Sequence, residues 1–209
     1  MSAAVLAPAP APVSVVPLPE TGVRPRRWTR DEYYRAAEMG LFGPEERLEL
    51  LNGEILEKMT ENAPHVTGLD LTLAQLVAAF AGQSCYVRVQ HPIALPGAAS
   101  DPEPDLAVVS GTPRAYQARH PQPQEILLLV EVSNTTLTFD RGPKAAAYAA
   151  AGIREYWVLN LSDRRLEVHQ DPQNGTYQTV TPHDENQAVS PLAAPQAPVR
   201  VADLLPSPA

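Results

Sequence analysis

The chain has 209 residues, with 24 Asp or Glu and 16 Lys or Arg, which gives a formal charge of −8. A hydrophobic share of 44% excludes a wholly disordered chain, and the acidic balance argues against a protein that coats nucleic acid through a general basic surface. The single cysteine, Cys85, excludes an intramolecular disulfide and a multi-cysteine zinc site, and no apolar run is long enough to span a membrane.

Proline is frequent, with 23 residues, and it is concentrated toward the two ends of the chain. Residues 1–26 are rich in Pro, Ala and Val, and we expect them to be disordered. A single domain is expected over 27–205, followed by a tail over 206–209. Within this domain, the Pro/Ala-rich stretch 190–198 precedes VRVADLL, which predicts a short final strand.

The first predicted elements are a helix and a hairpin. Thr29 followed by Glu32 predicts a capping box, which begins a helix over DEYYRAAEM. Asn52-Gly53 between two apolar runs predicts a hairpin with a type I′ turn. Glu49 therefore lies on the first strand of this hairpin, three residues before the turn.

A second helix is predicted to begin near Pro64 and to end at Gly82. Its apolar residues recur at helical spacing, and one histidine lies on the same stripe. The stripe consists of His65, Leu69, Leu73, Leu76 and Phe80.

Strands and helices alternate in the remainder of the domain. CYVRVQ, DLAVVS and EILLLVEV predict strands, and the last is an apolar run typical of a central strand that is buried on both sides. DRGPKAAAYAAAG predicts a helix ending at Gly152, and EYWVLN predicts the next strand. RRLEVHQ and TYQTV predict a hairpin around Asn174-Gly175. The class is therefore α/β or α+β, with a mixed sheet flanked by helices.

One charge stands where an apolar residue is expected. Glu131 lies in the run EILLLVEV, and a carboxylate on a central strand is costly to bury unless it is paired or binds a cation. Alternation places Leu127, Leu129, Glu131 and Ser133 on one face of the strand. Asp105 opens the strand DLAVVS. Two carboxylates at the ends of adjacent strands can bind a hard divalent cation such as Mg²⁺.

The helix after this strand contributes a third group. Asp140, Lys144 and Tyr148 are spaced by four residues, so they share one helix face. A lysine beside two carboxylates can orient or activate a water molecule, or stabilise negative charge that develops on a phosphate.

The run from PEPDLAVV to LLLVEVSNTTLTFDRGPKAAAYAAAGIREYWVLN resembles the Uma-two-type restriction endonucleases, a family of the PD-(D/E)XK nuclease superfamily. The similarity extends from about Trp28 to Leu205 and includes the ELLNGEI hairpin. It is most specific between Glu131 and Trp157. The positions in this block that carry it are Ser133, Thr136, Asp140, Lys144, Tyr148, Glu155, Tyr156 and Trp157.

This resemblance implies a restriction-endonuclease-like core that follows an N-terminal helix and β-hairpin. Asp105 corresponds to the aspartate of the P-D motif and Glu131 to the glutamate of E-x-K. With the backbone carbonyl of Val132, these carboxylates would hold Mg²⁺ or Mn²⁺. Glu49 matches an acidic residue of the early hairpin, which adds to the site directly or through water.

The resemblance also assigns the amine of the site. Ser133 occupies the lysine position of the motif, so Lys144 from the following helix would supply the catalytic amine. The supporting residues would be Ser133, Asp140, His65 and Tyr148. Considered alone, His65 fits a core or helix-cap position better, and Tyr148 fits a packing role better.

Two positions depart from the family pattern. Asn134 follows the motif serine, where the family usually has proline, and Asn52 replaces the usual turn aspartate. Neither departure removes a proposed metal ligand. By resemblance, the protein would be a homodimer that acts on nucleic acid, most simply DNA.

Each candidate also has an ordinary structural explanation. Asp105 could be a strand-opening carboxylate, and Glu131 could be one half of a buried ion pair. Lys144 could be a solvated lysine that pairs with Asp140 on its own helix, and Glu49 an exposed strand residue.

The main hypothesis is therefore a cytoplasmic, metal-dependent endonuclease that hydrolyses phosphodiester bonds. The first alternative is an inactive nucleic-acid-binding or regulatory module on the same fold, which the overall acidity favours. The second is an interaction protein whose partner binds the Pro/Ala-rich segments.

Overall fold

A computed structural model of the chain describes residues 24–58 and 60–208. Most of the predicted disordered segment 1–26 lies outside these residues. The described part combines a central six-stranded mixed sheet with helices on both faces, which confirms the predicted class. None of its helices is long and apolar enough to cross a membrane.

The central sheet has the spatial order β3-β4-β5-β6-β7-β8. Neighbouring strands are antiparallel except for β5 and β6, which run parallel. A parallel pair needs a crossover, and the helical segment between these two strands provides it. The strands are β3 (Cys85–Val89), β4 (Leu106–Ser110), β5 (Ile126–Ser133), β6 (Glu155–Asn160), β7 (Arg165–Gln173) and β8 (Thr176–Asp184).

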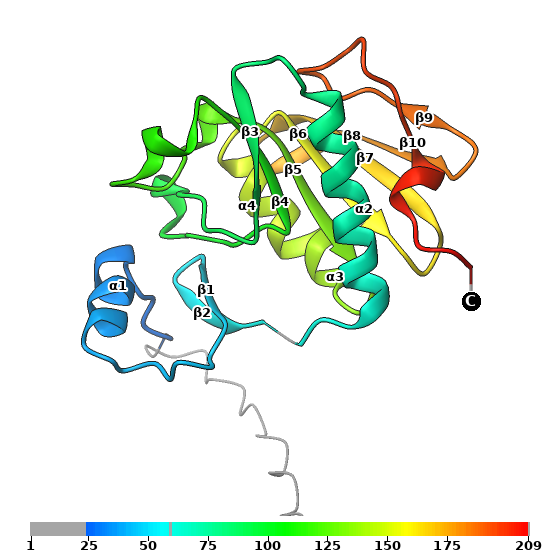
Figure 1. Ribbon diagram of the computed structural model, residues 1–209. Helices are drawn as coiled ribbons and strands as arrows, with labels where there is room; N and C mark the ends of the chain where they lie inside the picture. Colours follow the sequence, from blue (N-terminus) through cyan, green and yellow to red (C-terminus); the bar gives the residue numbers. More distant parts are fainter. Residues whose placement is uncertain (1–23, 59, 209) are drawn as a thin grey trace, which may run out of the picture.

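Helix α2 (Ala63–Ala79) covers one face of the sheet, and α4 (Ala145–Ala150) covers the opposite face (Figure 1). Leu69, Leu76 and Phe80 of the predicted stripe are buried between α2 and the sheet, which confirms that stripe as a core face. Gly68 allows the helix to approach closely, because a Cβ atom there would lie 3.1 Å from a methyl group of Val132.

The N-terminal elements are α1 (Arg30–Glu38) and the hairpin of β1 (Leu48–Leu51) and β2 (Glu54–Glu57). They lie beside the main sheet (Figure 1). The predicted capping box at the start of α1 is confirmed. The hairpin turn is confirmed as well, with positive φ at both Asn52 and Gly53.

A β-bridge attaches this hairpin to the main domain. Leu50 of β1 pairs with Asp101, whose backbone N–H donates to the Leu50 carbonyl at 2.8 Å. The bridge holds Glu49, the preceding residue, against the domain, so the small hairpin can contribute a side chain to a site on the main sheet.

Two details of the predicted strands are corrected. The β4–β5 register shifts because Val108 pairs with Leu128 and Val109 with Ile126. Leu127 is therefore the extra residue of a β-bulge and packs with the opposite face from Leu129, which breaks the predicted alternation at this position. The alternation is regular again by Glu131.

The C-terminal segment is also different from the prediction. Only Val199–Arg200 forms a strand, β10, which pairs with β9 (Ala188–Val189). The chain then turns into a 3-10 helix, η5 (Val201–Leu204), whose apolar residues pack on the α2 side of the core. Three further 3-10 turns are η1 (Pro96–Ala98), η2 (Pro113–Tyr116) and η3 (Pro123–Glu125).

The crossover between β5 and β6 is a helix with a widened turn. It consists of α3 (Leu137–Phe139), the π-helical turn η4 (Asp140–Lys144) and α4. Pro143 lies inside η4 and lacks an N–H, so a regular α-helical hydrogen bond cannot form there. Such π turns are often found at functional sites, and this one buries both Asp140 and Lys144.

Candidate functional site

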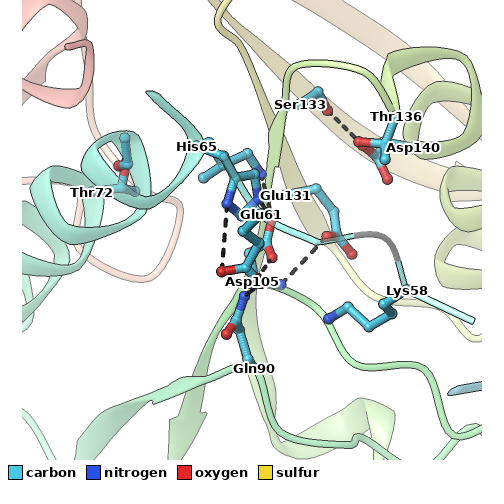
Figure 2. A network of polar contacts seen from close by, with 12 residues as sticks. Lys58, Glu61, His65, Thr72, Gln90, Asp105, Glu131, Ser133, Thr136 and Asp140 are labelled. Carbon is cyan, nitrogen blue, oxygen red and sulfur yellow. Dashed lines mark hydrogen bonds and ion pairs between the residues drawn. The ribbon is translucent and has the colours of Figure 1, made fainter. Parts of the chain in front are cut away.

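A pocket of about 310 Å³ lies where the end of β5 meets α2, the β1–β2 hairpin and the crossover helix. We call it the acidic pocket. Figure 2 shows its polar network, with His65 from α2 directed toward Asp105 and Glu131 lying next to them. The predicted site residues that line it are Glu49, His65, Asp105, Glu131, Asp140 and Lys144.

Asp105 is held by groups from β5 and α2. The β4–β5 ladder ends at Leu106 and Val130, so the N–H of Val132 donates to the Asp105 carboxylate at 2.8 Å instead of to a strand. His65 Nε2 lies 3.1 Å from the same oxygen. Burial acts to raise the pKa of Asp105, but His65, the charge of Lys144 and the Val132 N–H together outweigh it and lower that pKa.

Glu131 is buried at the centre of the pocket. Its Oε1 accepts hydrogen bonds from Lys144 Nζ at 2.9 Å and from Tyr148 Oη at 2.8 Å. The backbone N–H of Asp105 is 3.4 Å from the other oxygen. Burial raises the pKa of Glu131, and the neighbouring carboxylates add to this effect while Lys144 opposes it.

Lys144 joins two carboxylates from distant parts of the chain. Its Nζ lies 2.9 Å from Glu131 and 3.6 Å from Glu49. Burial acts to lower the pKa of Lys144, but the carboxylates outweigh it and raise that pKa, so the amine stays protonated. The alternative of a solvated lysine that pairs with Asp140 is wrong, because Lys144 is only 4% exposed.

The other structural alternatives are settled by the same contacts. The buried ion pair considered for Glu131 is present, and Lys144 is its partner. Glu49 is 3% exposed, so it is not an ordinary exposed strand residue. Its carboxylate also accepts the backbone N–H of Glu103 at 2.9 Å, which fixes the hairpin to the loop before β4.

Asp140 forms a separate set of hydrogen bonds at the edge of the pocket. Its Oδ2 accepts hydrogen bonds from Ser133 Oγ at 2.7 Å and from Thr136 Oγ1 at 2.6 Å (Figure 2). Burial raises the pKa of Asp140, while Lys144 and the two hydroxyl groups oppose the shift. Ser133 therefore fixes the start of the crossover helix to the end of β5.

His65 and Tyr148 both have polar contacts beyond simple packing. His65 lies in the cap region of α2, where its backbone N–H donates to the side chain of Asn62 at 3.1 Å, and its ring also faces the pocket. Its Nδ1 is buried, with Glu61 at 4.0 Å. Tyr148 is fully buried, packs against Tyr156, and also donates to Glu131.

Several residues in or beside the pocket were missed from the sequence. Gln90 follows β3 with a positive φ, and its amide nitrogen lies 3.4 Å from Asp105 and also donates to Glu61 (Figure 2). Lys58 Nζ donates to the carbonyl of Glu103 at 3.1 Å. Positive φ has no reliable sequence signal in glutamine, and Lys58 and Glu103 meet only through the fold, so no local pattern could have identified them.

The pocket has a large excess of negative charge. Six carboxylates line it against two lysines and one histidine. The carboxylates are Glu49, Glu57, Glu61, Asp105, Glu131 and Asp140, and the lysines are Lys58 and Lys144. Oxygen donors with uncompensated charge fit a hard divalent cation.

The side chains alone do not form a closed metal cage. Within the described residues, no group of three or more His, Cys, Asp or Glu side chains is arranged to hold a metal. This is compatible with Mg²⁺, which usually takes one or two carboxylates and completes its shell with waters and substrate oxygens. The role of the Val132 carbonyl stays a prediction.

Comparisons with known proteins agree with the resemblance seen in the sequence. The family model described as "Putative restriction endonuclease" (Uma2) matches residues 30–202. A crystal structure of "a putative nuclease belonging to DUF820" from Anabaena variabilis ATCC 29413 has a TM-score of 0.64 and 16% identity, over 84% of this chain and 96% of that chain. This likeness shows the fold. Among curated proteins there is no match. The chain belongs to the Uma2 family of putative restriction endonucleases.

Proposed function

We propose that this protein is a metal-dependent endonuclease that hydrolyses phosphodiester bonds of nucleic acid, with DNA as the first substrate to test. The observation that carries the proposal is the meeting of Glu49, Asp105, Glu131 and Lys144 in one pocket. These residues come from four separate segments of a chain that belongs to a family of putative restriction endonucleases.

The proposed cation is Mg²⁺ or Mn²⁺. Asp105 and Glu131 would hold it with the Val132 carbonyl, and Glu49 would contribute directly or through water. When bound, such an ion lowers the pKa of a coordinated water and stabilises negative charge on a phosphate. The charge of the pocket supports this proposal, because a phosphodiester anion would be repelled from six carboxylates unless a cation accompanied it.

The protein side chains hold and polarise the reacting groups. Lys144 stays protonated, so its amine can orient the attacking water and stabilise the charge that develops on the scissile phosphate. Glu131 and Glu49 fix the position of that amine through the contacts described above. Tyr148 donates to Glu131, and His65 fixes the carboxylate of Asp105, so these two are positioning residues.

An inactive nucleic-acid-binding module on the same fold is the second candidate. The formal charge of −8 favours a regulatory role for this module, because such a role does not need the basic surface from which tight binding of a polyanion benefits. The homodimeric state and the cytoplasmic location expected from the sequence are still predictions.

Cleavage of a mixed substrate panel separates the two candidates. Linear, supercoiled and single-stranded DNA and RNA would be incubated with Mg²⁺, Mn²⁺ or EDTA. The proteins compared would be wild type, Glu131→Gln and Glu155→Gln. Glu155 is the matched control, because it is also a fully buried strand carboxylate but lies outside the acidic pocket.

The endonuclease predicts cleavage that requires the metal, is lost in Glu131→Gln and is retained in Glu155→Gln. Equal products from all three proteins would show that the activity does not come from this pocket. Binding of the substrates by wild type without any cleavage would support the inactive module.

A further inference from the structure

A second pocket, of about 320 Å³, lies between α1 and the loop that connects η2 to η3. We call it the arginine pocket. Its polar walls are Arg30 and Tyr34 from α1 and Arg119, His120 and Gln122 from the loop. No carboxylate is among the described residues that line it, in contrast to the acidic pocket.

The two arginines of this pocket keep donors available for a ligand. Arg30 uses its Nε to donate to Asp101 at 2.8 Å, and the described residues accept no hydrogen bond from its two terminal nitrogens. Arg119 binds Glu125 through both terminal nitrogens, at 2.6 and 2.7 Å, while its side chain remains 46% exposed. A guanidinium group has five N–H donors, so neither arginine is saturated by these contacts.

Arg30, Arg119 and the nearby Arg88 bring positive charge to this region, and Asp101 and Glu125 pair with the first two of them. The ring of His120 stacks on Tyr34 at a centroid distance of 6.0 Å. Burial lowers the pKa of His120; the charge of Asp101 opposes this shift, and the charges of Arg88 and Arg30 add to it. Arg88 itself bonds only neutral oxygens of Tyr86 and Pro92, and no carboxylate of the described chain lies within ion-pair distance of it. An anion is therefore the ligand that this region favours.

The arginine pocket is connected to the acidic pocket through the β-bridge of Leu50 and Asp101. On β1, Glu49 extends into the acidic pocket and Leu50 forms the bridge. On the opposite segment, Asp101 orients Arg30 at the arginine pocket, while the backbone of Glu103 binds Glu49. The bridge between β1 and the segment 101–103 thus fixes both pockets to the same part of the domain.

We propose that the arginine pocket is a subsite for a backbone phosphate of the nucleic acid other than the phosphate that is cleaved in the acidic pocket. The proposal rests on the endonuclease function proposed above and names the part of the substrate that this second pocket recognises. Arginine recognises phosphate through paired N–H donors, and such contacts position a strand without reading its bases. An acidic protein would thereby gain a local anchor for its substrate.

Binding of a fluorescein-labelled single-stranded DNA oligonucleotide in EDTA tests the pocket separately from catalysis. The variant is Arg119→Gln, and the matched control is Arg200→Gln. Arg200 is also an exposed arginine with two hydrogen bonds to one carboxylate, that of Asp203, but it lies outside both pockets. Both changes remove one positive charge, so general electrostatics cannot distinguish them.

Arg119→Gln is expected to weaken binding by roughly tenfold and Arg200→Gln to leave it unchanged. The slope of log affinity against log salt should fall by about 0.7 in the first variant only. Gln122→Glu provides a second test, because it adds a carboxylate to the pocket wall without removing a cation. Gln124→Glu, on the exposed side of the same turn, is its control.

The results separate this inference from the endonuclease function. If wild type cleaves DNA but neither pocket variant binds more weakly than its control, the phosphate subsite is wrong and the nuclease stands. If binding depends on Arg119 and Gln122 but no substrate is cleaved, the subsite stands and the nuclease is wrong. No oligonucleotide binding by wild type would overturn the subsite.

Discussion

The acidic pocket and the arginine pocket differ in the charge of the side chains that line them, and therefore in the charge of the ligand that each favours. The first gathers six carboxylates around two lysines, and the second has two arginines and no carboxylate on its wall. In the first pocket, the pKa of Glu131 is raised by burial among carboxylates. In the second, burial lowers the pKa of His120, with help from neighbouring arginines and against the charge of Asp101. The first pocket favours a cation and the second an anion.

From this difference we expect the two pockets to have different roles. The acidic pocket is suited to chemistry on a phosphate that arrives together with a metal ion, whereas the arginine pocket is suited to holding a phosphate that does not react. Changes in the acidic pocket should therefore reduce turnover or metal affinity, and changes in the arginine pocket should raise KM. Substitutions in and around the two pockets test this difference in their roles.

The largest effect is expected from Lys144→Met, which keeps the length of the side chain and removes its charge. Turnover should fall by about 10²–10³-fold, because the group that stabilises developing charge is lost. Metal binding should be largely retained. Lys58→Met is the control, since it removes the other lysine of the same pocket without freeing Glu131. Equal losses in the two variants, measured as kcat, would mean that Lys144 acts only through the charge of the pocket.

A smaller effect is expected from His65→Leu, because His65 acts through Asp105. Metal affinity should fall by about 10–100-fold, as is typical for a partner that orients a metal ligand. His65→Gln, which keeps a donor near Asp105, should recover part of the loss. The affinity would be measured from the Mn²⁺ concentration that gives half-maximal cleavage. A purely structural role for His65 would instead lower the melting temperature and leave this concentration unchanged.

Gly68→Ala tests the contact between α2 and β5 that presents His65 to the acidic pocket. The new Cβ would lie 3.1 Å from a methyl group of Val132 and 3.2 Å from one of Leu161, so helix and strand must separate slightly. We expect a loss of about 1–3 kcal/mol in the free energy of unfolding, measured with urea. Metal-dependent turnover should fall as well, while oligonucleotide binding in EDTA, which depends on the arginine pocket, should not change.

The smallest effect concerns Glu155, the buried carboxylate outside both pockets. Burial raises its pKa, although Trp157 Nε1, Gln170 and the backbone of Leu192 donate to it. A raised folded-state pKa gives stability that is present below the unfolded value and is lost as the pH rises through the folded value. Wild type should therefore lose stability relative to Glu155→Gln as the pH rises from about 4.5.

Urea unfolding of both proteins at several pH values would measure this difference. A difference that stays constant with pH would mean that Glu155 titrates in the same range in the folded and unfolded states. The comparison also shows whether a buried carboxylate in this sheet is tolerated without a cation, which would sharpen the contrast with Glu131.

Much of the fold could be predicted from local patterns. The capping box at Thr29, the turn at Asn52-Gly53 and the buried run of β5 each have a signal within a few residues, and each is confirmed. The bulge at Leu127 and the 3-10 turn after Val199–Arg200 could not be predicted, because they depend on which neighbouring strand or helix the segment meets.

Part of the candidate site could also be predicted from the sequence, but for a different reason. Glu131 is conspicuous because a charge interrupts an apolar strand, and the spacing of Lys144 from Tyr148 indicated one helix face. Their meeting with Glu49 follows from the bridge between Leu50 and Asp101, which no local pattern encodes. The arginine pocket was missed because its walls come from α1 and from a loop about ninety residues away, and each arginine alone has an ordinary ion pair.

The most direct test of the central claim is a titration of Mn²⁺ into the metal-free protein, with the free ion followed by its EPR signal. The proteins would be wild type, Asp105→Asn, Glu131→Gln and the control Glu155→Gln. A cation site in the acidic pocket predicts clearly weaker binding in Asp105→Asn and Glu131→Gln and unchanged binding in Glu155→Gln. The same affinity in all four proteins would contradict it, because the buried carboxylates of the pocket would then hold no metal.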